Sequence, residues 1–449
     1  MTRTIAQRAA VIGGSIAGLL AARVLSEYFN EVVVFDSDEI EDAPLVRKSV
    51  PQGHHLHALL HGGLRVLSSL YPSFTDDLRR LGATRIAIGR DAVWYLPDGK
   101  AYNPTGSVRT PFYSGLEGYT ASRGLLECVI RRRTAASSNV RFEYGTTVGD
   151  LLCRDGTVRG LRCRDSRSIE CDLVVDATGR GHRARQWLTA VGFPPPDETT
   201  IGLDTAYSTA NFRRPRSYSG EPLVFITGPA PHFTRRGYVI AIENETLLVS
   251  LIGRFGDYPP TDKDGFLAFA SQLHSDLAYR IIKDGEQLTP IAHQRFVSSG
   301  QRHYELLEQR PNGFLVIGDA LCHFNPIFAQ GMSAAAIQAE ILRGLLSGHA
   351  EQSHGLTGIG ASFFSKAADF NRTPWELAAG FDFAFPQTRG MRPPGFEARA
   401  RYFTALDKLA AKDAEVLGLM TEVFHLVKPL SVLQQEPLRS RVLSSFSHS

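Results

Sequence analysis

The sequence predicts an α/β protein built on a Rossmann-like dinucleotide-binding domain, followed by a β-rich second domain and C-terminal helices. Residues 9–25 contain an apolar strand, a glycine-rich turn and a helix, and residues 313–348 repeat this order near the end of the chain. Between these two units, residues 205–252 contain alternating apolar and polar runs that are typical of antiparallel strands.

The composition describes a globular protein with 43% hydrophobic and 21% charged residues. A length of 449 residues allows roughly two or three domains, and a net charge of +3 does not indicate a nucleic-acid partner. We find no run of about 18 apolar residues and no room for a signal peptide before the first strand. Five cysteines are scattered without metal-ligand spacing, which predicts reduced thiols in a cytoplasm and no metal site.

The glycine-rich turn after the first strand is the first candidate site. Residues 11–18 are VIGGSIAG, with Ser15 at the middle glycine position of G-x-G-x-x-G, where a small residue still lets the backbone approach a pyrophosphate. A second apolar strand ends at Asp36, 23 positions after Gly13 and close to the expected interval for a ribose-binding acid. A plain βαβ unit with glycines for packing is the alternative. The candidate residues are Gly13, Gly14, Ser15, Ile16, Ala17, Gly18, Asp36 and Ser37.

The second strand–turn–helix unit combines a carboxylate with a helix start. Asp319 follows the apolar strand over residues 314–317, at the end of the strand where open α/β sheets bind ligands. The helix over residues 332–346 begins with free backbone N–H groups that can face an anion. An aspartate turn before an ordinary helix is the alternative. This unit adds Asp319, Pro326, Gln330, Gly331 and Met332 to the candidate site.

Residues 141–176 alternate and are interrupted by turns, which predicts a small antiparallel meander that returns into the parallel sheet. Its last apolar strand, residues 173–175, ends in a third turn with the sequence DATG. Asp176 could cap the following helix through its side chain. Because it is one of three turns at the same edge of the predicted sheet, we place Asp176 and Gly179 on the cofactor side.

The GGSIAG, DATGR and GDALCHFNP segments, in this order, resemble the FAD-dependent aromatic hydroxylase superfamily, the group A flavoprotein monooxygenases. Within it, residues 50–60 (VPQGHHLHALL) and 318–332 (GDALCHFNPIFAQGM) resemble a branch of actinobacterial flavin epoxidases and hydroxylases of secondary metabolism. The resemblance covers nearly the whole chain. It implies an FAD-binding domain of the glutathione-reductase type and a β-sheet substrate domain that faces the flavin.

The resemblance also implies the domain boundaries and three further cofactor residues. Arg47 is expected to reach the cofactor, Arg123 to face the FAD phosphates unless it is a salt-bridged surface residue, and the Val148 backbone to touch the adenine. We assign residues 1–70, 105–193 and 290–350 to the FAD-binding domain, 71–104 and 194–289 to the substrate domain, and 351–449 to a C-terminal helical region. Helices are expected there over residues 363–370, 374–385, 396–412 and 414–426.

Four histidines between residues 54 and 61 raise the question of a metal site. His57 and His61 have the spacing of two helical ligands, but the H-E-x-x-H pattern is missing, and we predict no metal. The alternative is a helix that begins after Pro51 and Gly53 and packs its leucines inward. His54, His57 and His323 are noted without a role, and no catalytic residue is assigned.

The function implied by the resemblance is that of an FAD-dependent monooxygenase. It would insert one oxygen atom from O2 into a bulky hydrophobic secondary metabolite, by hydroxylation or epoxidation through a flavin hydroperoxide. NADPH or NADH would reduce FAD directly or through a separate flavin reductase.

Two alternatives remain. The first is an FAD-dependent reductase of a prenyl or polyene double bond, although the Y-x-W-x-F-P motif of such reductases and the W-x-W-x-I-P motif of flavin halogenases are absent. The second is a flavin-binding accessory protein without turnover, which Ser15 and Ala329 at glycine positions of the family would suit.

Overall fold

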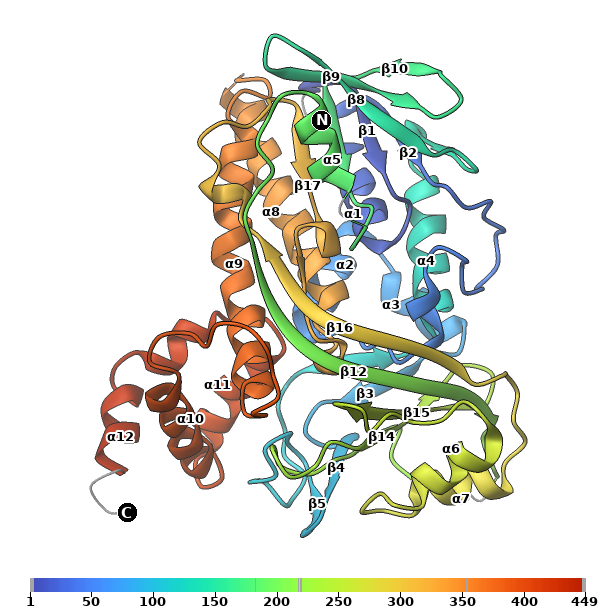
Figure 1. Cartoon of the computed structure of the whole chain (residues 1–449), viewed down its shortest axis with the longest axis vertical. Helices are drawn as coiled ribbons and strands as arrows, with labels where there is room; N and C mark the ends of the chain where they lie inside the picture. The colour runs from blue at the N-terminus through green and yellow to red at the C-terminus, as the bar shows by residue number, and fades with distance from the viewer. Residues whose placement is uncertain (1–3, 182, 217, 219, 353, 446–449) are drawn as a thin grey trace.

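A five-stranded parallel sheet forms the centre of the first domain (Figure 1). Its strand order is β17 (Phe314–Val316), β11 (Leu173–Asp176), β1 (Ala6–Ile12), β2 (Phe29–Phe35) and β7 (Val140–Glu143). The computed structural model describes residues 4–181, 183–216, 218, 220–352 and 354–445. Because β1, β11 and β17 are parallel neighbours, the turns that follow them meet at one edge of the sheet.

Helices cover this sheet, and both predicted strand–turn–helix units are confirmed. The turn after β1 leads into α1 (Ile16–Leu25), and the loop after β17 leads into α8 (Gly331–Gln352). Strand β1 and helix α1 contribute residues that are fully buried in the main hydrophobic core. The other helices of this domain are α2 (His61–Leu70), α3 (Phe74–Arg80), α4 (Arg123–Ala135) and α5 (Arg183–Ala190).

A small antiparallel sheet lies above the parallel sheet in Figure 1. It has the strands β8 (Val148–Arg154), β9 (Thr157–Cys163) and β10 (Ser168–Glu170), and β11 then returns the chain to the parallel sheet. The meander expected in this part of the sequence is therefore confirmed.

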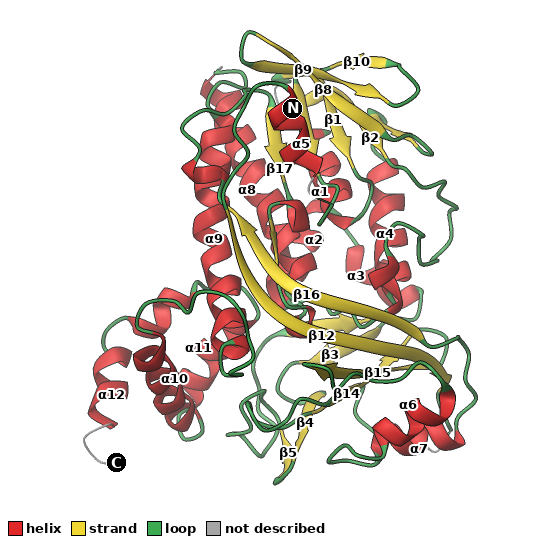
Figure 2. Ribbon diagram, viewed as in Figure 1, coloured by secondary structure: helices red, strands yellow, loops and turns green. Residues whose placement is uncertain are grey.

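An eight-stranded sheet forms the second domain, and its two longest strands extend up to the first domain (Figure 2). Its order is β18 (Cys322–His323), β16 (Ala292–Arg302), β12 (Glu198–Arg213), β15 (Thr246–Arg254), β14 (Arg236–Ile242), β13 (Leu223–Ile226), β4 (Ala92–Leu96) and β5 (Gly99–Ala101). A separate pair joins β3 (Thr84–Ala87) to β6 (Glu117–Thr120). The β-rich domain predicted from alternating residues is confirmed.

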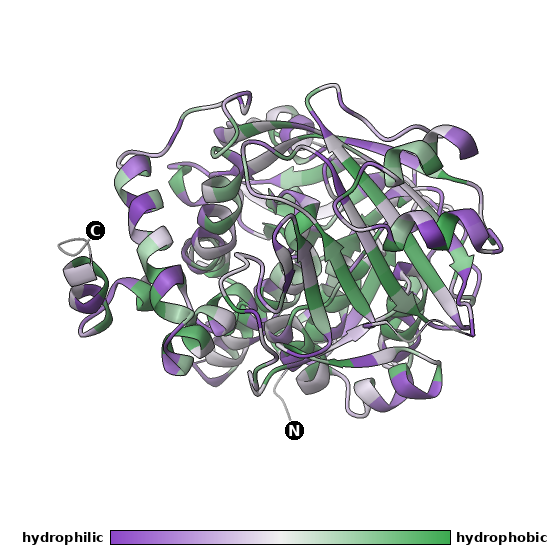
Figure 3. Ribbon diagram, turned by 90° about the horizontal axis from the view of Figure 1, so that it is seen from below, coloured by the Kyte–Doolittle hydropathy of each residue, from purple (hydrophilic) through white to green (hydrophobic). Residues whose placement is uncertain are grey.

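The eight-stranded sheet buries apolar side chains on both faces, and hydrophobic residues run along its strands in Figure 3. One face packs against α6 (Lys263–Ala270) and α7 (Leu277–Asp284). The other face packs against the end of α9 (Ile359–Asp382), through residues such as Ala379 and Phe383. This second face points toward the first domain and the C-terminal helices.

The remaining helices, α10 (Phe396–Ala410), α11 (Ala414–Phe424) and α12 (Leu438–Ser444), share a hydrophobic core of their own. Short 3-10 turns complete the chain: η1 (Pro51–His54), η2 (Tyr304–Leu306), η3 (Gly318–Ala320), η4 (Pro326–Phe328) and η5 (Leu430–Gln434). Within the part of the chain that the structure describes, no helix has both the length and the apolarity needed to cross a membrane.

Three expected helix positions are wrong. Pro51 begins only a 3-10 turn, and α2 starts at His61, because Ala58 pairs with Thr120 in an extended bridge. Helix α9 continues through Pro374, although two helices were expected there. Residues before Pro374 pack in the main core and residues after it pack on the eight-stranded sheet, which supports both halves. Helix α3 lies within residues 71–104, for which no helix was predicted from the sequence.

Candidate cofactor and substrate site

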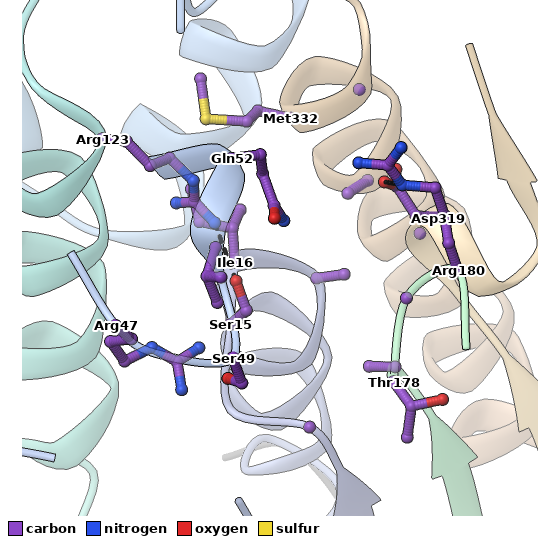
Figure 4. A pocket seen from close by; sticks show the side chains of 18 of the residues that line it. Ser15, Ile16, Arg47, Ser49, Gln52, Arg123, Thr178, Arg180, Asp319 and Met332 are labelled. Carbon is purple, nitrogen blue, oxygen red and sulfur yellow. Dashed lines mark hydrogen bonds and ion pairs between the residues drawn. The ribbon is translucent and has the colours of Figure 1, made fainter. Parts of the chain in front are cut away.

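A cavity of about 440 Å³ lies at the carboxyl edge of the parallel sheet, where the three predicted turns meet. We call it the cofactor cavity. Figure 4 shows Arg47, Arg123 and Ser15 on one side of it and Asp319 with Arg180 on the other. The predicted residues that line it are Gly13, Ser15, Ile16, Ala17, Asp36, Ser37, Arg47, Arg123, Val148, Gly179, Asp319, Pro326, Gln330, Gly331 and Met332.

The N-terminus of α1 faces the cofactor cavity without a side-chain cap. Ser15 is its N-cap residue, but its hydroxyl makes no capping hydrogen bond. Instead the Ser15 Oγ donates to Glu127 Oε2 at 2.9 Å and accepts from Arg123 Nη2 at 2.8 Å. The first backbone N–H groups of the helix therefore keep their partial positive charge for a ligand.

Arg123 is only 6% exposed and forms an ion pair of 2.8 Å with Glu127. Its Nε and Nη1 atoms are buried and have no hydrogen-bond partner within the described part of the chain. Burial lowers the pKa of the Arg123 guanidinium. A buried cation with unpaired donors beside a helix N-terminus fits an anionic phosphate group, and the alternative of a surface arginine does not hold.

Arg47 contacts Glu127, the carboxylate that also pairs with Arg123. Its Nη1 lies 2.8 Å from Asp36 Oδ2 and its Nε lies 2.5 Å from Glu127 Oε1. Burial lowers the pKa of Arg47, but the neighbouring Glu127 and Asp36 carboxylates outweigh it and raise the pKa overall. Asp36 Oδ2 also accepts the Gly14 N–H at 2.7 Å. Asp36 thus lines the cavity while it holds the glycine-rich turn in place.

Three of the predicted cofactor residues do not line the cavity, and the structure shows local contacts for each of them. Gly14 donates its N–H to Asp36, as described above. A Cβ atom on Gly18 would lie 1.7 Å from the Gly13 carbonyl oxygen, so this glycine permits close packing of α1 on the turn. Asp176 is 1% exposed and its Oδ1 accepts the Thr178 N–H at 2.9 Å. Its carboxylate stabilises its own turn.

The start of α8 borders the cavity from the other direction. Ala329 adopts the left-handed conformation with φ of +53°, and Gln330 follows at the helix start. Gln330 is 1% exposed, and both polar atoms of its side-chain amide lack a partner among the residues described. Arg180 Nε lies 3.6 Å from Asp319 Oδ2. These groups offer donors and acceptors to a polar ring.

The histidines noted in the sequence lie in different environments. His57 lines the cofactor cavity, His54 is exposed outside it, and His323 is buried in β18 with its ring 6.3 Å from that of Phe296. His55, which the sequence did not single out, also lines the cavity and lies 2.8 Å from the Thr209 hydroxyl. In the described ranges, no three histidine, cysteine or acidic side chains are grouped as metal ligands.

Side chains from the second domain complete the cavity, and sequence reasoning missed them. Tyr207, Tyr238, Gln294 and Phe296 line it from β12, β14 and β16. Their positions depend on the register of an eight-stranded sheet, for which the sequence has no local signal.

A second cavity of about 980 Å³, which we call the substrate cavity, lies between the eight-stranded sheet and the C-terminal helices. It shares Leu56, Ala58, Tyr238 and Ala329 with the cofactor cavity, so the two are adjoining. Its lining includes many aromatic rings, and examples are Trp94, Phe225, Phe328, Trp375, Phe381 and Phe403.

Comparisons with known proteins agree with this architecture. Protein Rv3254 of Mycobacterium tuberculosis is 34% identical over 410 residues, which cover 86% of this chain and 84% of that protein. A kynurenine 3-monooxygenase of Salinispora arenicola is 24% identical over 79% of this chain and 76% of its own length. No family model matches the chain.

Two solved structures show the same fold at low sequence identity. The flavin-dependent brominase Bmp2 has a TM-score of 0.69 at 12% identity and covers 100% of both chains. A 2-methyl-3-hydroxypyridine-5-carboxylic acid oxygenase has a TM-score of 0.63 at 18% identity and covers 90% of this chain and 97% of its own. The chain belongs to the family of the mycobacterial protein, and it shares its fold with the brominase and the oxygenase.

The residues that line the cofactor cavity fit FAD, the cofactor that the sequence resemblance implies. The unpaired nitrogens of Arg123 lie beside the uncapped start of α1, where phosphates bind in dinucleotide folds. The unpaired amide of Gln330 lies beside the start of α8. Both groups are buried polar atoms to which a ligand in the cavity can supply hydrogen-bond partners.

Proposed function

We propose that this chain is an FAD-dependent monooxygenase that inserts one oxygen atom from O2 into a bulky hydrophobic small molecule, by hydroxylation or epoxidation. The observation that carries the proposal is the junction of the two cavities. A cavity with a buried arginine and a helix N-terminus, which fit an anionic dinucleotide, adjoins a cavity of about 980 Å³ that is large enough for a bulky ligand.

Different residues act at the two ends of the cofactor cavity. Arg123 and the N–H groups of α1 hold the phosphates, and the start of α8 with Gln330 offsets negative charge at the other end. The bound flavin, when reduced, supplies the activation of molecular oxygen. The aromatic walls of the substrate cavity orient the reacting carbon and exclude water from it.

NADPH or NADH provides the electrons in this proposal, either directly or through a separate flavin reductase. The oxygenases among the similar proteins support oxygen insertion. A role in secondary metabolism follows from the resemblance of residues 50–60 and 318–332 to actinobacterial epoxidases and hydroxylases.

The test begins with the visible absorption spectrum of purified protein reconstituted with FAD, followed in air after addition of NADPH. Flavin bands are expected, and their bleaching identifies direct reduction, whereas persistent bands call for an added flavin reductase. Candidate aromatic and polyene compounds are then incubated under ¹⁸O2. A product that gains one labelled oxygen atom supports monooxygenation. A reduced, unlabelled product identifies a reductase, and failure to retain FAD overturns the proposal.

A further inference from the structure

The substrate cavity contains charged side chains among its aromatic lining, and most of them have partners. Each pairing is within the cavity wall: two are ion pairs, and in the third the carboxylate accepts hydrogen bonds from hydroxyl groups. The pairs are Arg109 with Asp98, Arg399 with Glu376 at 2.9 Å, and Asp407 with the hydroxyls of Thr105 and Ser107.

Arg236 is the exception. It lies at the start of β14, lines the substrate cavity and is 8% exposed. No hydrogen bond or ion pair joins its guanidinium to any residue that the structure describes, and its Nε atom is fully buried. Its guanidinium lies over the ring of Phe381, whose centroid is 4.5 Å from the Arg236 Cζ. A buried cation without an anionic partner is unfavourable unless a ligand supplies one.

The carboxylate of Asp382 interacts electrostatically with Arg236, but no hydrogen bond joins the two, and Asp382 Oδ2 has no hydrogen-bond partner among the described residues. Asp382 Oδ1 lies 2.8 Å from Arg254 Nη2 and accepts the Asn325 side-chain N–H at 2.7 Å. Arg254 is stacked near the same Phe381 ring, at 5.3 Å from its centroid. Two guanidinium groups and one carboxylate therefore leave an uncompensated positive charge at the wall of the cavity.

We propose that Arg236 binds a carboxylate of the substrate, so that the substrate class is a bulky aromatic or polyene carboxylic acid. The inference rests on the proposed function, because it takes this cavity as the substrate site. The fork of N–H donors on a guanidinium matches a carboxylate in a bidentate geometry. The aromatic lining accepts the apolar body of the same molecule.

The position of Arg236 also orients this acid. Tyr238, two residues along β14, lines both cavities and marks their junction. Residues two apart in a strand lie on one face, roughly 7 Å apart. The carboxylate is therefore held beside the junction, and the apolar body has the shared opening at Leu56, Ala58 and Ala329 through which to approach the cofactor cavity.

The test uses two fluorescent probes of the same shape, 1-pyrenebutyrate and the neutral 1-pyrenebutanol, titrated into the purified full-length protein. A charge-assisted bidentate contact predicts that wild type binds the acid at least about tenfold more tightly than the alcohol. Equal affinities, or no binding of the acid, overturn the proposal. FAD retention is measured on the same sample, so a loss of flavin binding is recognised separately as a failure of the proposed function.

Variants assign the preference to one residue. Arg236→Gln should bind the acid and the alcohol equally while its affinity for the alcohol is unchanged, and Arg236→Lys should keep part of the preference. Arg235→Gln is the matched control, because Arg235 is ion-paired with Asp257 at 2.7 Å and lies against Phe269 instead. The assignment to Arg236 is contradicted if Arg236→Gln still binds the acid more tightly than the alcohol to the same extent as wild type. It is also contradicted if Arg235→Gln loses that preference.

Discussion

Arg123 differs from the other arginines of α4 in what surrounds its guanidinium group. Its charge is buried, and two of its nitrogens have no partner in the described chain. Arg132, on the same helix, is exposed, and its Nε lies 2.7 Å from Asp42. A phosphate group therefore gains new hydrogen bonds from Arg123, whereas Arg132 has no unmet donors facing the cavity.

Replacing Arg123 should weaken the binding of FAD. A hydrogen bond to a charged group contributes about 1.5–3 kcal/mol, so we expect Arg123→Gln to lower FAD affinity about 10- to 100-fold. The affinity is measured by quenching of flavin fluorescence, with circular dichroism to show that the variant is folded. Arg132→Gln serves as the control and should bind FAD like wild type. A folded Arg123→Gln protein with unchanged FAD affinity would contradict the assignment of this arginine.

Cavity residues that lie next to a recognisable sequence motif were predictable. Residues that meet only because distant segments pack together were not. Ser15 and Asp319 are marked by the glycines and short strands beside them, which fix their place at the sheet edge. The Arg236, Arg254 and Asp382 cluster combines two strands with the end of α9. No spacing in the sequence records that such separate segments meet, because their contact depends on how the sheet and the helix pack.

At the level of elements, the crossing of α1 over the turn after β1 depends on two glycines. Gly13 has φ of +104°, a conformation that L side chains rarely adopt. A Cβ atom on Gly18 would lie 1.7 Å from the Gly13 carbonyl oxygen. The helix lies this close to the turn because neither residue has a side chain there.

Gly18→Ala should therefore destabilise the protein although alanine favours helices. Overpacking typically costs about 1–3 kcal/mol, and this backbone contact leaves little room to relax, so we expect at least about 2 kcal/mol of lost unfolding free energy. Gly344→Ala in α8 is the control, since a Cβ there meets nothing within 4 Å. That change should raise stability by up to about 1 kcal/mol. Urea unfolding measures both, and equal effects of the two changes would argue against the packing role of Gly18.

Element boundaries differed from their predicted positions wherever tertiary contacts outweighed local signals. Leu60 donates its backbone N–H to the Ser333 hydroxyl at 3.0 Å, which keeps residues before His61 out of the helix. Gly63 packs against the same serine on α8. Pro51 predicts a helix start from local sequence alone. It carries no information about contacts with Ser333, which lies 273 positions after Leu60.

Across the whole molecule, two buried histidines lie in separate parts of the fold. His55 lies beside Thr209 of the eight-stranded sheet, and His425 accepts the His61 N–H at 3.4 Å where α11 meets α2. Each is 7% exposed. Burial lowers the pKa of His55 to about 4 and that of His425 to about 3 from the ordinary value of 6.5. Both side chains are therefore neutral in the folded protein near pH 7.

Stability should consequently fall as the solution is acidified below about pH 6.5. In that range the unfolded chain binds protons on these histidines and the folded chain does not, so acid favours unfolding, and the full stability is present above pH 6.5. Burial likewise lowers the pKa of His57 to about 3. Each of the three histidines contributes a slope of up to about 1.4 kcal/mol per pH unit, and together they give up to about 4 kcal/mol per unit. Urea unfolding at pH 7.5, 6.5 and 5.5 measures this slope. His425→Gln should remove about a third of it, because the amide oxygen can still accept the His61 N–H but does not titrate. A flat profile in wild type, or the full slope in His425→Gln, would show that the buried histidines do not control the acid sensitivity of the fold.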